Sequence, residues 1–197
     1  IPCLAINDPE LNVRAGFFAS DNQGGGKLAA EYLHAKGHRN LLVMNGPMES
    51  RDSAFRLKGF MNFYKQVEGP SEITVVQGNF HERVAAAAFE AFYKTAKSKS
   101  VTAVFCCNDL MALGVLAKIK EMGLSCPKDI SVIGYDDDKK SQLSTPPLTT
   151  IHAPVYDLVK DGTERLVAHL QNEDGRVFSQ QTLYPVRLVE RASVREV

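Results

Sequence analysis

The chain has 197 residues, of which 44% are apolar, and its 23 basic residues balance its 23 acidic residues to a net charge of zero. This length accommodates one large domain or two small ones, with a substantial buried core. A neutral chain argues against binding of nucleic acid or anionic membranes by these residues themselves, and the sequence contains no apolar run long enough to span a bilayer.

The apolar residues along the chain predict strands and helices in alternation. Short apolar runs rich in β-branched residues indicate strands, and apolar residues three or four positions apart indicate helices. Strands are expected at residues 1–6, 17–19, 41–44, 73–76, 104–107, 132–135, 148–151 and 183–189, and helices at 28–33, 50–64, 84–93, 110–122 and 157–170. This alternation predicts an α/β fold with parallel, doubly wound sheets and helices on both faces.

A run of three glycines, Gly24 to Gly26, stands before the first predicted helix. Together with Lys27 it invites a phosphate-loop interpretation. The glycine spacing is wrong for such a loop, however, and Leu28 follows the lysine where serine or threonine would be required. We expect instead that these glycines let a helix begin close to neighbouring backbone.

The most informative stretch is the predicted strand–helix–strand unit between residues 104 and 136. Its two strands must be parallel, because a helix connects them. Asn108 and Asp109 follow the first strand, and Asp136 and Asp137 end the second. Both polar pairs therefore lie at the carboxyl edge of the sheet, where open parallel sheets bind their ligands.

The ends of other predicted strands add polar and aromatic side chains at this edge. The candidates comprise a hydroxyl, two carboxylates, a guanidinium, an aromatic ring and an amide: Ser50, Asp52, Arg56, Phe80, Asn108 and Asp136. Planar groups such as those of arginine and aspartate form paired hydrogen bonds with adjacent hydroxyls. An aromatic ring can stack on the apolar C–H face of a pyranose or furanose. The set is therefore typical of sugar recognition.

Each candidate also has a structural interpretation, which the residues alone leave open. Phe80 would be a core residue at the start of a helix, and Arg56 a solvated helix residue. Asp136 or Asp137 would be turn formers, while Asp52 and Asp109 would cap helices.

Catalytic and metal-binding patterns are weak. The sequence contains no G-x-S-x-G motif, and Gly37 ends the helix between His34 and His38, which argues against a shared metal. Three consecutive aspartates at 136–138 could bind a hard cation but more often form a solvated turn. The four cysteines lack C-x-x-C spacing and are expected to be small apolar core residues in a reducing compartment. We therefore expect no enzyme, no metal site and no cofactor.

Seven segments, taken in order, resemble the lactose/galactose repressor family. They are G-H-R-N-L at 37–41, N-G-P at 45–47, R-L-K-G-F at 56–60, C-N-D-L-M-A-L-G at 107–114, D-I-S-V-I-G-Y-D-D at 129–137, P-P-L-T-T-I at 146–151 and L-V-E-R-A-S at 188–193. The resemblance extends over nearly the whole chain. It is to the effector-binding domain of that family, which shares its fold with periplasmic sugar-binding proteins.

The resemblance implies a periplasmic-binding-protein-like type I fold made of two subdomains. Residues 1–20 and 154–182 would form a partial N-terminal subdomain, and residues 21–153 and 183–197 a complete C-terminal effector-binding subdomain. The helix-turn-helix of the family and most of the first subdomain would precede Ile1.

The resemblance also implies a function. Such proteins are cytoplasmic transcriptional regulators that dimerise through this domain. A small ligand between the subdomains changes their relative orientation and thereby the affinity for operator DNA. The ligand positions of the family fall on Asn7, Asp8, Arg56, Phe80, Asn108 and Asp136, while Ser50 and Asp52 match positions that vary with the ligand.

The chain departs from the family pattern at three positions. Asn7 and Asp8 stand where Asp-Arg is common, and Ala153 stands where glutamine often occurs. The arginine, amide and carboxylate candidates favour a sugar over a purine as the effector. A sugar-binding protein of a transport system is the alternative function, and an enzyme that uses Asp136 as an acid or base is a weaker one.

Overall fold

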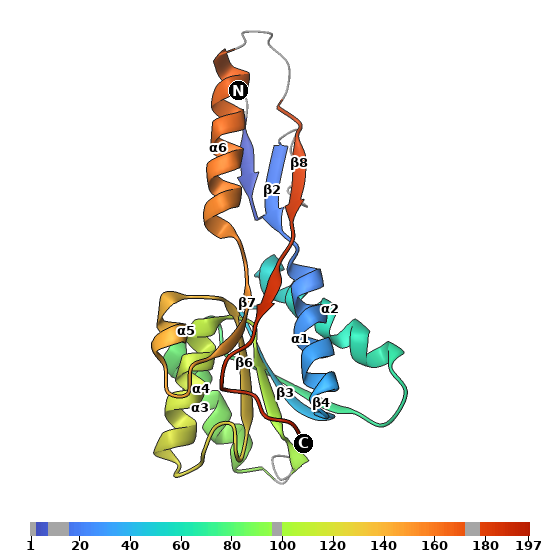
Figure 1. Ribbon diagram of the computed structural model, residues 1–197, viewed down its shortest axis with the longest axis vertical. Coiled ribbons are helices and arrows are strands. Elements are labelled where there is room, and N and C mark those ends of the chain that lie inside the picture. Colours follow the sequence, from blue (N-terminus) through green and yellow to red (C-terminus); the bar gives the residue numbers. More distant parts are fainter. Residues whose placement is uncertain (1–2, 8–15, 96–99, 172–177) are drawn as a thin grey trace. The chain divides into compact units, whose positions relative to one another are not determined.

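The computed structural model describes residues 3–7, 16–95, 100–171 and 178–197 (Figure 1). The chain forms two compact units. We call Ile1–Asp21 with Ala153–Val186 the small unit, and Asn22–His152 with Arg187–Val197 the large unit.

The large unit is built on one sheet, whose strand order in the described part of the chain is β4-β3-β5-β6-β7-β9. The strands are β3 (Asn40–Asn45), β4 (Glu72–Gln77), β5 (Ala103–Cys106), β6 (Ser131–Asp136), β7 (Thr149–His152) and β9 (Arg187–Val189). Neighbouring strands are parallel, except that β9 runs antiparallel to β7. The carboxyl ends of the parallel strands therefore meet at one edge.

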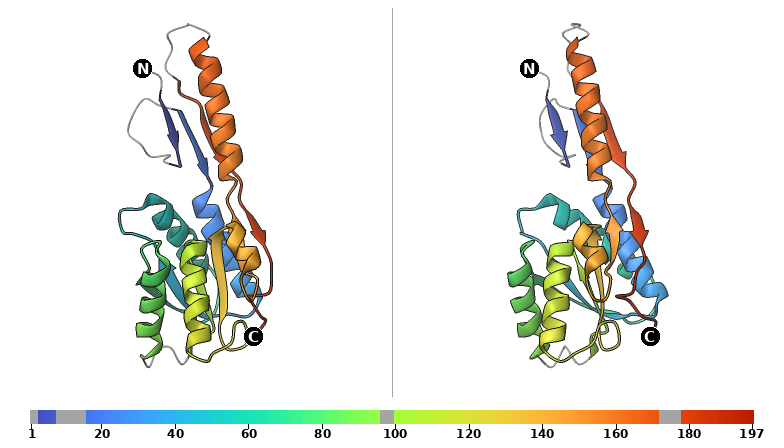
Figure 2. Two further views of the ribbon diagram at one scale, coloured as in Figure 1. Left: turned by 90° about the vertical axis from the view of Figure 1, so that its left-hand side faces the viewer. Right: turned by 60° about the vertical axis from the view of Figure 1, so that its left-hand side comes forward.

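Helices cover both faces of this sheet (Figures 1 and 2). One face carries α1 (Asn22–Ala35) and α2 (Arg51–Gln66), which pack against each other, and the other carries the pair α3 (Glu82–Tyr93) and α4 (Asp109–Glu121). The short helix α5 (Lys139–Leu143) follows β6. This arrangement confirms the predicted doubly wound α/β fold.

The core of the large unit lies between the sheet and these helices. Every residue of β5 is buried, as expected for a central parallel strand covered on both sides. Phe60 of α2 stacks on Phe105 of β5, with the ring centroids 4.8 Å apart. Burial of large apolar side chains in this way supplies most of the favourable free energy of folding.

Glycines bring α1 and α2 into close contact. A Cβ atom at Gly26 would clash with the backbone oxygen of Arg56, and one at Gly59 with the backbone oxygen of Gln23. Helix α1 begins at Asn22, earlier than predicted, so the glycine run lies inside its first turns. The expectation of close approach to neighbouring backbone is confirmed for Gly26, whereas Gly25 lies against the Tyr135 side chain.

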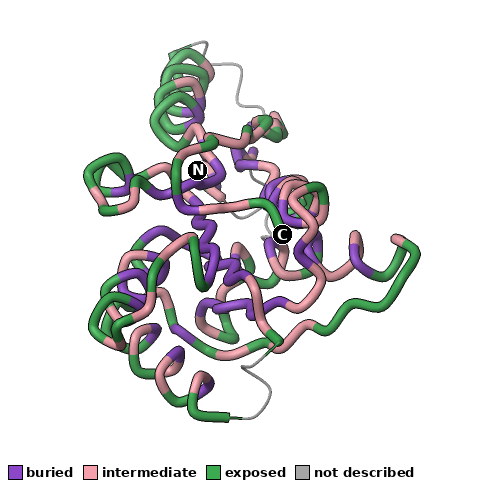
Figure 3. The backbone as a smooth tube through the Cα atoms, turned by 60° about the horizontal axis from the view of Figure 1, so that its bottom comes forward, coloured by how far each residue is buried: buried purple, intermediate pink, exposed green. Residues whose placement is uncertain are grey.

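The small unit contains, within its described residues, a parallel sheet in the order β1-β2-β8 and one helix. These elements are β1 (Leu4–Ile6), β2 (Gly16–Ser20), α6 (Val155–Gln171) and β8 (Gln181–Tyr184). The core is small: Phe18, Leu158 and Phe178 are buried, and the two phenylalanine rings stack with centroids 6.4 Å apart. Helix α6 is otherwise exposed over most of its surface (Figure 3).

The C-terminal segment differs from the single strand predicted at residues 183–189. Strand β8 pairs with β2 in the small unit, whereas β9 pairs with β7 in the large unit. Pro185 lies between them and lacks the N–H group that a continuous ladder would need. The predicted subdomain boundary between residues 182 and 183 falls inside β8, and the chain changes unit after Val186 instead.

His38 connects the start of the central sheet to the C-terminal segment. Its side chain is fully buried, with Nδ1 2.8 Å from the Thr102 hydroxyl and Nε2 3.0 Å from the carbonyl oxygen of Arg195. Burial lowers the pKa of His38 from 6.5 to about 4, although the Arg195 carbonyl acts in the opposite direction. The folded chain therefore holds this imidazole neutral.

We predict that His38 makes stability depend on pH. The unfolded histidine binds a proton at about pH 6.5 and the folded one only at about pH 4, so stability falls as the pH falls through this window. The loss reaches about 3 kcal/mol at the acidic end. Urea unfolding at a series of pH values measures it.

Two substitutions isolate this effect. His38→Gln cannot titrate and should flatten the pH dependence of the free energy of unfolding. His81→Gln changes an exposed histidine and should leave that dependence as it is. Equal pH dependence in the wild type and in His38→Gln would show that other groups cause it.

Candidate functional site

Arg56 of α2 is the centre of the carboxyl edge. Its side chain is buried, and its Nε donates to Oδ1 of Asn22 at 2.8 Å. Its Nη1 donates to the backbone oxygen of Cys107 at 2.6 Å and to Oδ1 of Asp136 at 3.2 Å. The guanidinium carbon lies 3.8 Å from the centroid of the Tyr135 ring. Arg56 is therefore not a solvated helix residue.

Asp136 ends β6 and forms the ion pair with Arg56. Burial raises the pKa of Asp136 to about 7; the Arg56 guanidinium opposes this, and the carboxylates of Asp109 and Asp52 reinforce it. The side chain nevertheless keeps 40% of its surface exposed. Water at that surface moderates the effect of burial, and a ligand can reach the carboxylate.

Asn22 extends this network to Asp52, and sequence reasoning missed it. Its Oδ1 accepts from Arg56 while its Nδ2 donates to Oδ1 of Asp52 at 2.8 Å. The side chain is buried, at the first residue of α1. The sequence shows only a polar residue in a run of turn formers, so the partner 34 positions away leaves no local signal.

Asn108 is the N-cap of α4 and is buried. Its Oδ1 accepts from the backbone N–H of Met111 at 2.9 Å, which satisfies one of the unpaired donors at the start of the helix. The cap uses the oxygen, so Nδ2 is the group that Asn108 can offer to a ligand. The alternative of Asp109 as the cap is wrong.

Ser50 and Asp52 lie at the start of α2. Ser50 is the N-cap, and its Oγ accepts from the backbone N–H of Ser53 at 3.3 Å. Asp52 is in the first turn, where a carboxylate also interacts favourably with the helix dipole. The structure thus places Asp52 next to Asn22 rather than in the capping position.

Phe80 lies in the loop between β4 and α3, at the same edge. Its φ of 57° is in the left-handed region, which is uncommon for a residue with a bulky side chain. A Cβ at Gly46 would clash with the Phe80 ring, so the ring packs on the backbone that follows β3. Phe80 is half-buried and therefore not a fully buried core residue.

Of the two candidates nearest the N-terminus, the structure describes Asn7, which belongs to the small unit. Asn7 accepts at Oδ1 from the backbone N–H of Ser20 at 3.0 Å, and its own N–H donates to the oxygen of Phe18. Its side chain thereby connects the end of β1 to the end of β2. Asp8 lies outside the described residues.

Asp137 is more than a turn former. Its carboxylate accepts from Arg191 at 2.5 Å and lies 3.1 Å from Nδ1 of His152. It therefore ties the end of β6 to the end of β7 and to the segment after β9. Consecutive aspartates thus contact different elements, and they do not converge on a cation. Among the described residues, no group of three or more His, Cys, Asp or Glu side chains is placed to hold a metal ion.

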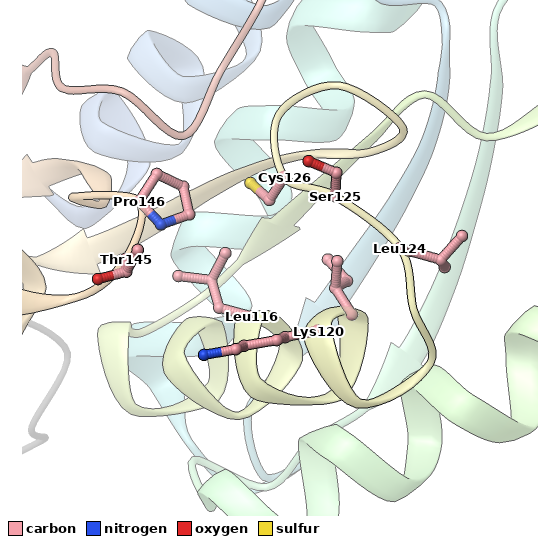
Figure 4. A pocket seen from close by; sticks show the side chains of 8 residues that line it. Leu116, Lys120, Leu124, Ser125, Cys126, Thr145 and Pro146 are labelled. Atoms are coloured by element: carbon pink, nitrogen blue, oxygen red, sulfur yellow. The ribbon is translucent and has the colours of Figure 1, made fainter.

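A pocket of about 260 Å³ lies elsewhere in the large unit (Figure 4). It is located between the C-terminal half of α4 and two loops, and its lining is mostly apolar: Leu116, Ile119, Lys120, Leu124, Ser125, Cys126, Thr145 and Pro146. None of the predicted site residues lines it. No helix in the described part of the chain is long and apolar enough to cross a membrane.

An open, mainly parallel sheet with an Arg–Asp pair and an amide at its carboxyl edge is typical of α/β proteins that bind small ligands there. Residues 30–194 match the family described as periplasmic binding protein-like domain, and the chain belongs to this family. The family match and the similarity to repressors described next confirm the resemblance to the lactose/galactose repressors.

The chain is 39% identical over 174 residues to the HTH-type transcriptional repressor PurR of Salmonella arizonae. That alignment covers 87% of this chain and 50% of the repressor, so the chain spans about half the length of the curated relatives it matches.

Two solved structures show the same fold. One is a LacI family transcriptional regulator from Enterococcus faecalis V583 with bound ribose, with a TM-score of 0.87 and 27% identity over 100% of this chain and 70% of that one. The other is the transcriptional regulator CelR in complex with cellobiose, with a TM-score of 0.87 and 26% identity over 98% of this chain and 59% of that one.

We predict that Arg56→Gln destabilises the large unit by about 3 kcal/mol, because it leaves Asp136 and Asn22 without their buried partner. Urea unfolding at neutral pH measures the loss. The matched control is Arg83→Gln, on the exposed side of α3, which should change the free energy of unfolding by less than about 0.5 kcal/mol. Similar effects of the two substitutions would contradict the structural role of Arg56.

Proposed function

We propose that these residues are the effector-binding part of a ligand-responsive transcriptional regulator, and that its effector is a sugar. The observation that carries the proposal is the Arg56–Asp136 pair at the carboxyl edge of the sheet, with the Asn108 amide beside it on the neighbouring strand end. The family membership and the relatives named as regulators support the regulatory half of the proposal.

The geometry of the edge suits a polyhydroxylated ligand. The partly exposed Asp136 carboxylate accepts hydrogen bonds from adjacent hydroxyls, and Nδ2 of Asn108 donates one. The Phe80 ring offers an apolar face for the C–H side of a sugar. Ser50 and Asp52, at the start of α2, are the positions at which the choice of sugar would be made.

The charges at this edge favour a neutral ligand. Arg56 is the cation of the network, and its charge is already compensated by Asp136. Asp52 and Asp109 add two further carboxylates that interact with Asp136, so acidic groups outnumber the single guanidinium at this edge. An anionic ligand such as a sugar phosphate would be repelled, whereas a neutral sugar loses no such energy on binding.

Regulation requires a partner outside these residues. The curated relatives are named helix-turn-helix repressors, and the chain spans about half of their length. We propose that operator DNA is bound by a part of the protein beyond these 197 residues, in the cytoplasm, and that the protein is not an enzyme. The names of the relatives favour this function over sugar transport. By resemblance, Asn7 and Asp8 are further ligand residues.

We also propose that the protein is a homodimer. Leu143 of α5 exposes 83% of its surface, and the chain just after it lines the apolar pocket described above. In a twofold dimer, the leucine of each protomer can contact the apolar pocket of the other, so the same contact forms twice.

We predict that Asp136→Ala lowers the affinity for the effector by about 100-fold, because two hydrogen bonds to a charged group are lost. Titration calorimetry of the full-length protein measures this with D-ribose, D-galactose and cellobiose, and with adenine as the purine alternative. Binding of adenine but of no sugar would contradict the proposed effector.

A matched control variant removes one carboxylate, as Asp136→Ala does, but at a position away from the proposed site. Asp129→Ala removes a carboxylate just before the other end of β6, where it accepts from the backbone N–H of Ser125 at 2.7 Å. This variant should bind the sugar as tightly as the wild type. If Asp136→Ala also binds normally, the site is wrongly assigned.

We predict that Leu143→Asp converts the dimer into monomers, because a charge in the interface is poorly solvated there. Analytical ultracentrifugation measures the oligomeric state. Met48→Asp is the control, since Met48 is also 83% exposed but precedes α2. A dimer that persists in Leu143→Asp would exclude this surface as the interface.

A further inference from the structure

Asp109 is a buried carboxylate that the proposed sugar site does not contact directly. It exposes 1% of its surface at the first residue of α4. Its Oδ2 accepts from the Ser141 hydroxyl at 2.5 Å and from the backbone N–H of Asp138 at 2.9 Å, and its Oδ1 accepts from the Thr150 hydroxyl at 2.7 Å. A buried carboxylate is costly, and these three donors offset much of that cost.

One of these donors, Asp138, directly follows the turn that presents Asp136, and another, Ser141, lies in helix α5, which begins after that turn. This turn is unusual, because Asp136 and Asp137 have φ values of 114° and 62°, which residues with side chains rarely adopt. Such a conformation persists only when surrounding contacts hold it. Asp138 directly follows the strained residues and Ser141 lies in the helix after them, and both donate to the same oxygen of Asp109.

We propose that Asp109 is a positioning residue, which holds the turn after β6 so that the Asp136 carboxylate stays directed at Arg56 and at the sugar. The proposal rests on the proposed sugar site at Asp136. Asp109 is also the neighbour of Asn108, so one helix start carries a ligand-binding amide and the anchor of the opposing carboxylate. The two arms of the site are thereby fixed relative to each other.

The Asp109 carboxylate also packs closely against the backbone of β6. A Cβ atom at Gly134 would clash with Oδ1 of Asp109, so the carboxylate lies directly against the strand, two residues before Asp136. It thus contacts the strand before the turn, the residues after it, and the neighbouring strand β7 through Thr150. A contact on both sides of a turn is what a positioning role requires.

Asp109 also contributes its charge. The charged groups that face Asp136 are Arg56 and Asp52 of α2 and Asp109 of α4. Burial has the largest effect and raises the pKa of Asp136; among the charged groups, the guanidinium lowers this pKa and the carboxylates raise it. Neutralising Asp109 without changing its shape should therefore lower the pKa of Asp136 and shift the pH dependence of sugar binding in the same direction.

Two substitutions at position 109 separate shape from charge. In Asp109→Asn the amide oxygen can accept from Asp138 and Ser141, and the amide N–H can donate to the Thr150 hydroxyl. Asp109→Ala removes all three contacts. Ser141→Ala removes one of them, and it keeps the proposal testable if Asp109→Ala does not fold.

The first measurement needs no ligand. Amide hydrogen exchange of the full-length protein should be at least about tenfold faster across residues 136–141 in Asp109→Ala, and intermediate in Ser141→Ala. Asp109→Asn should restore slow exchange there. Exchange in α1 and β3 should stay as in the wild type, because a general loss of stability would accelerate exchange in those elements as well. Carboxyl NMR should show Asp136 titrating at a lower pH in Asp109→Asn than in the wild type.

The second measurement uses sugars. Calorimetry with D-ribose, D-galactose and cellobiose should show a loss of about 30-fold or more in Asp109→Ala and of less than about threefold in Asp109→Asn above pH 8. The pH at which affinity is half-maximal should be lower in Asp109→Asn. If no sugar binds the wild type, the proposed function fails, while exchange and NMR still decide the role of Asp109. Unchanged exchange at 136–141 in Asp109→Ala and Ser141→Ala, or an unchanged Asp136 titration in Asp109→Asn, would overturn the proposal.

Discussion

The guanidinium of Arg56 is almost completely removed from water, and a charge in that position is costly unless it is paired and hydrogen-bonded. Groups from three other elements meet this requirement: Asn22 at the start of α1, the backbone oxygen after β5 at Cys107, and Asp136 at the end of β6, with the Tyr135 ring below. Satisfying one buried cation therefore brings separate parts of the sheet edge together. The same contacts leave the Asp136 carboxylate partly exposed, so the structural network and the proposed ligand site share a residue.

The close packing of α1 on α2 is what allows this network to form. Gly26 and Gly59 let the two helix backbones approach, which places Asn22 within hydrogen-bonding distance of both Arg56 and Asp52. A larger residue at either glycine would separate the helices and lengthen these bonds. The packing of the two helices and the hydrogen bonds around Arg56 thus both depend on Gly26 and Gly59.

Sequence patterns predicted the architecture and most of the edge, since apolar periodicity reports which faces are buried and strand ends report where ligands bind. They missed contacts that depend on side-chain geometry between distant positions. Asn22 resembled an ordinary turn residue, and Asp109 and Asp137 resembled a helix cap and a turn former. The division of the last strand was missed because Pro185 interrupts a run whose two halves have similar composition but pair in different sheets. The ligand roles of Asn7, Asp8 and the other candidates stay predictions.

One contact of Arg56 differs in kind from the others, because Cys107 contributes its backbone oxygen and not its side chain. Every amino acid supplies that oxygen, so no substitution at position 107 removes the group itself. The other partners, Asn22 and Asp136, can each be replaced by a single mutation. The residues that select a ligand can therefore change during evolution while Arg56 keeps its hydrogen bond to the main chain. The same sheet edge can in this way acquire new ligand specificities.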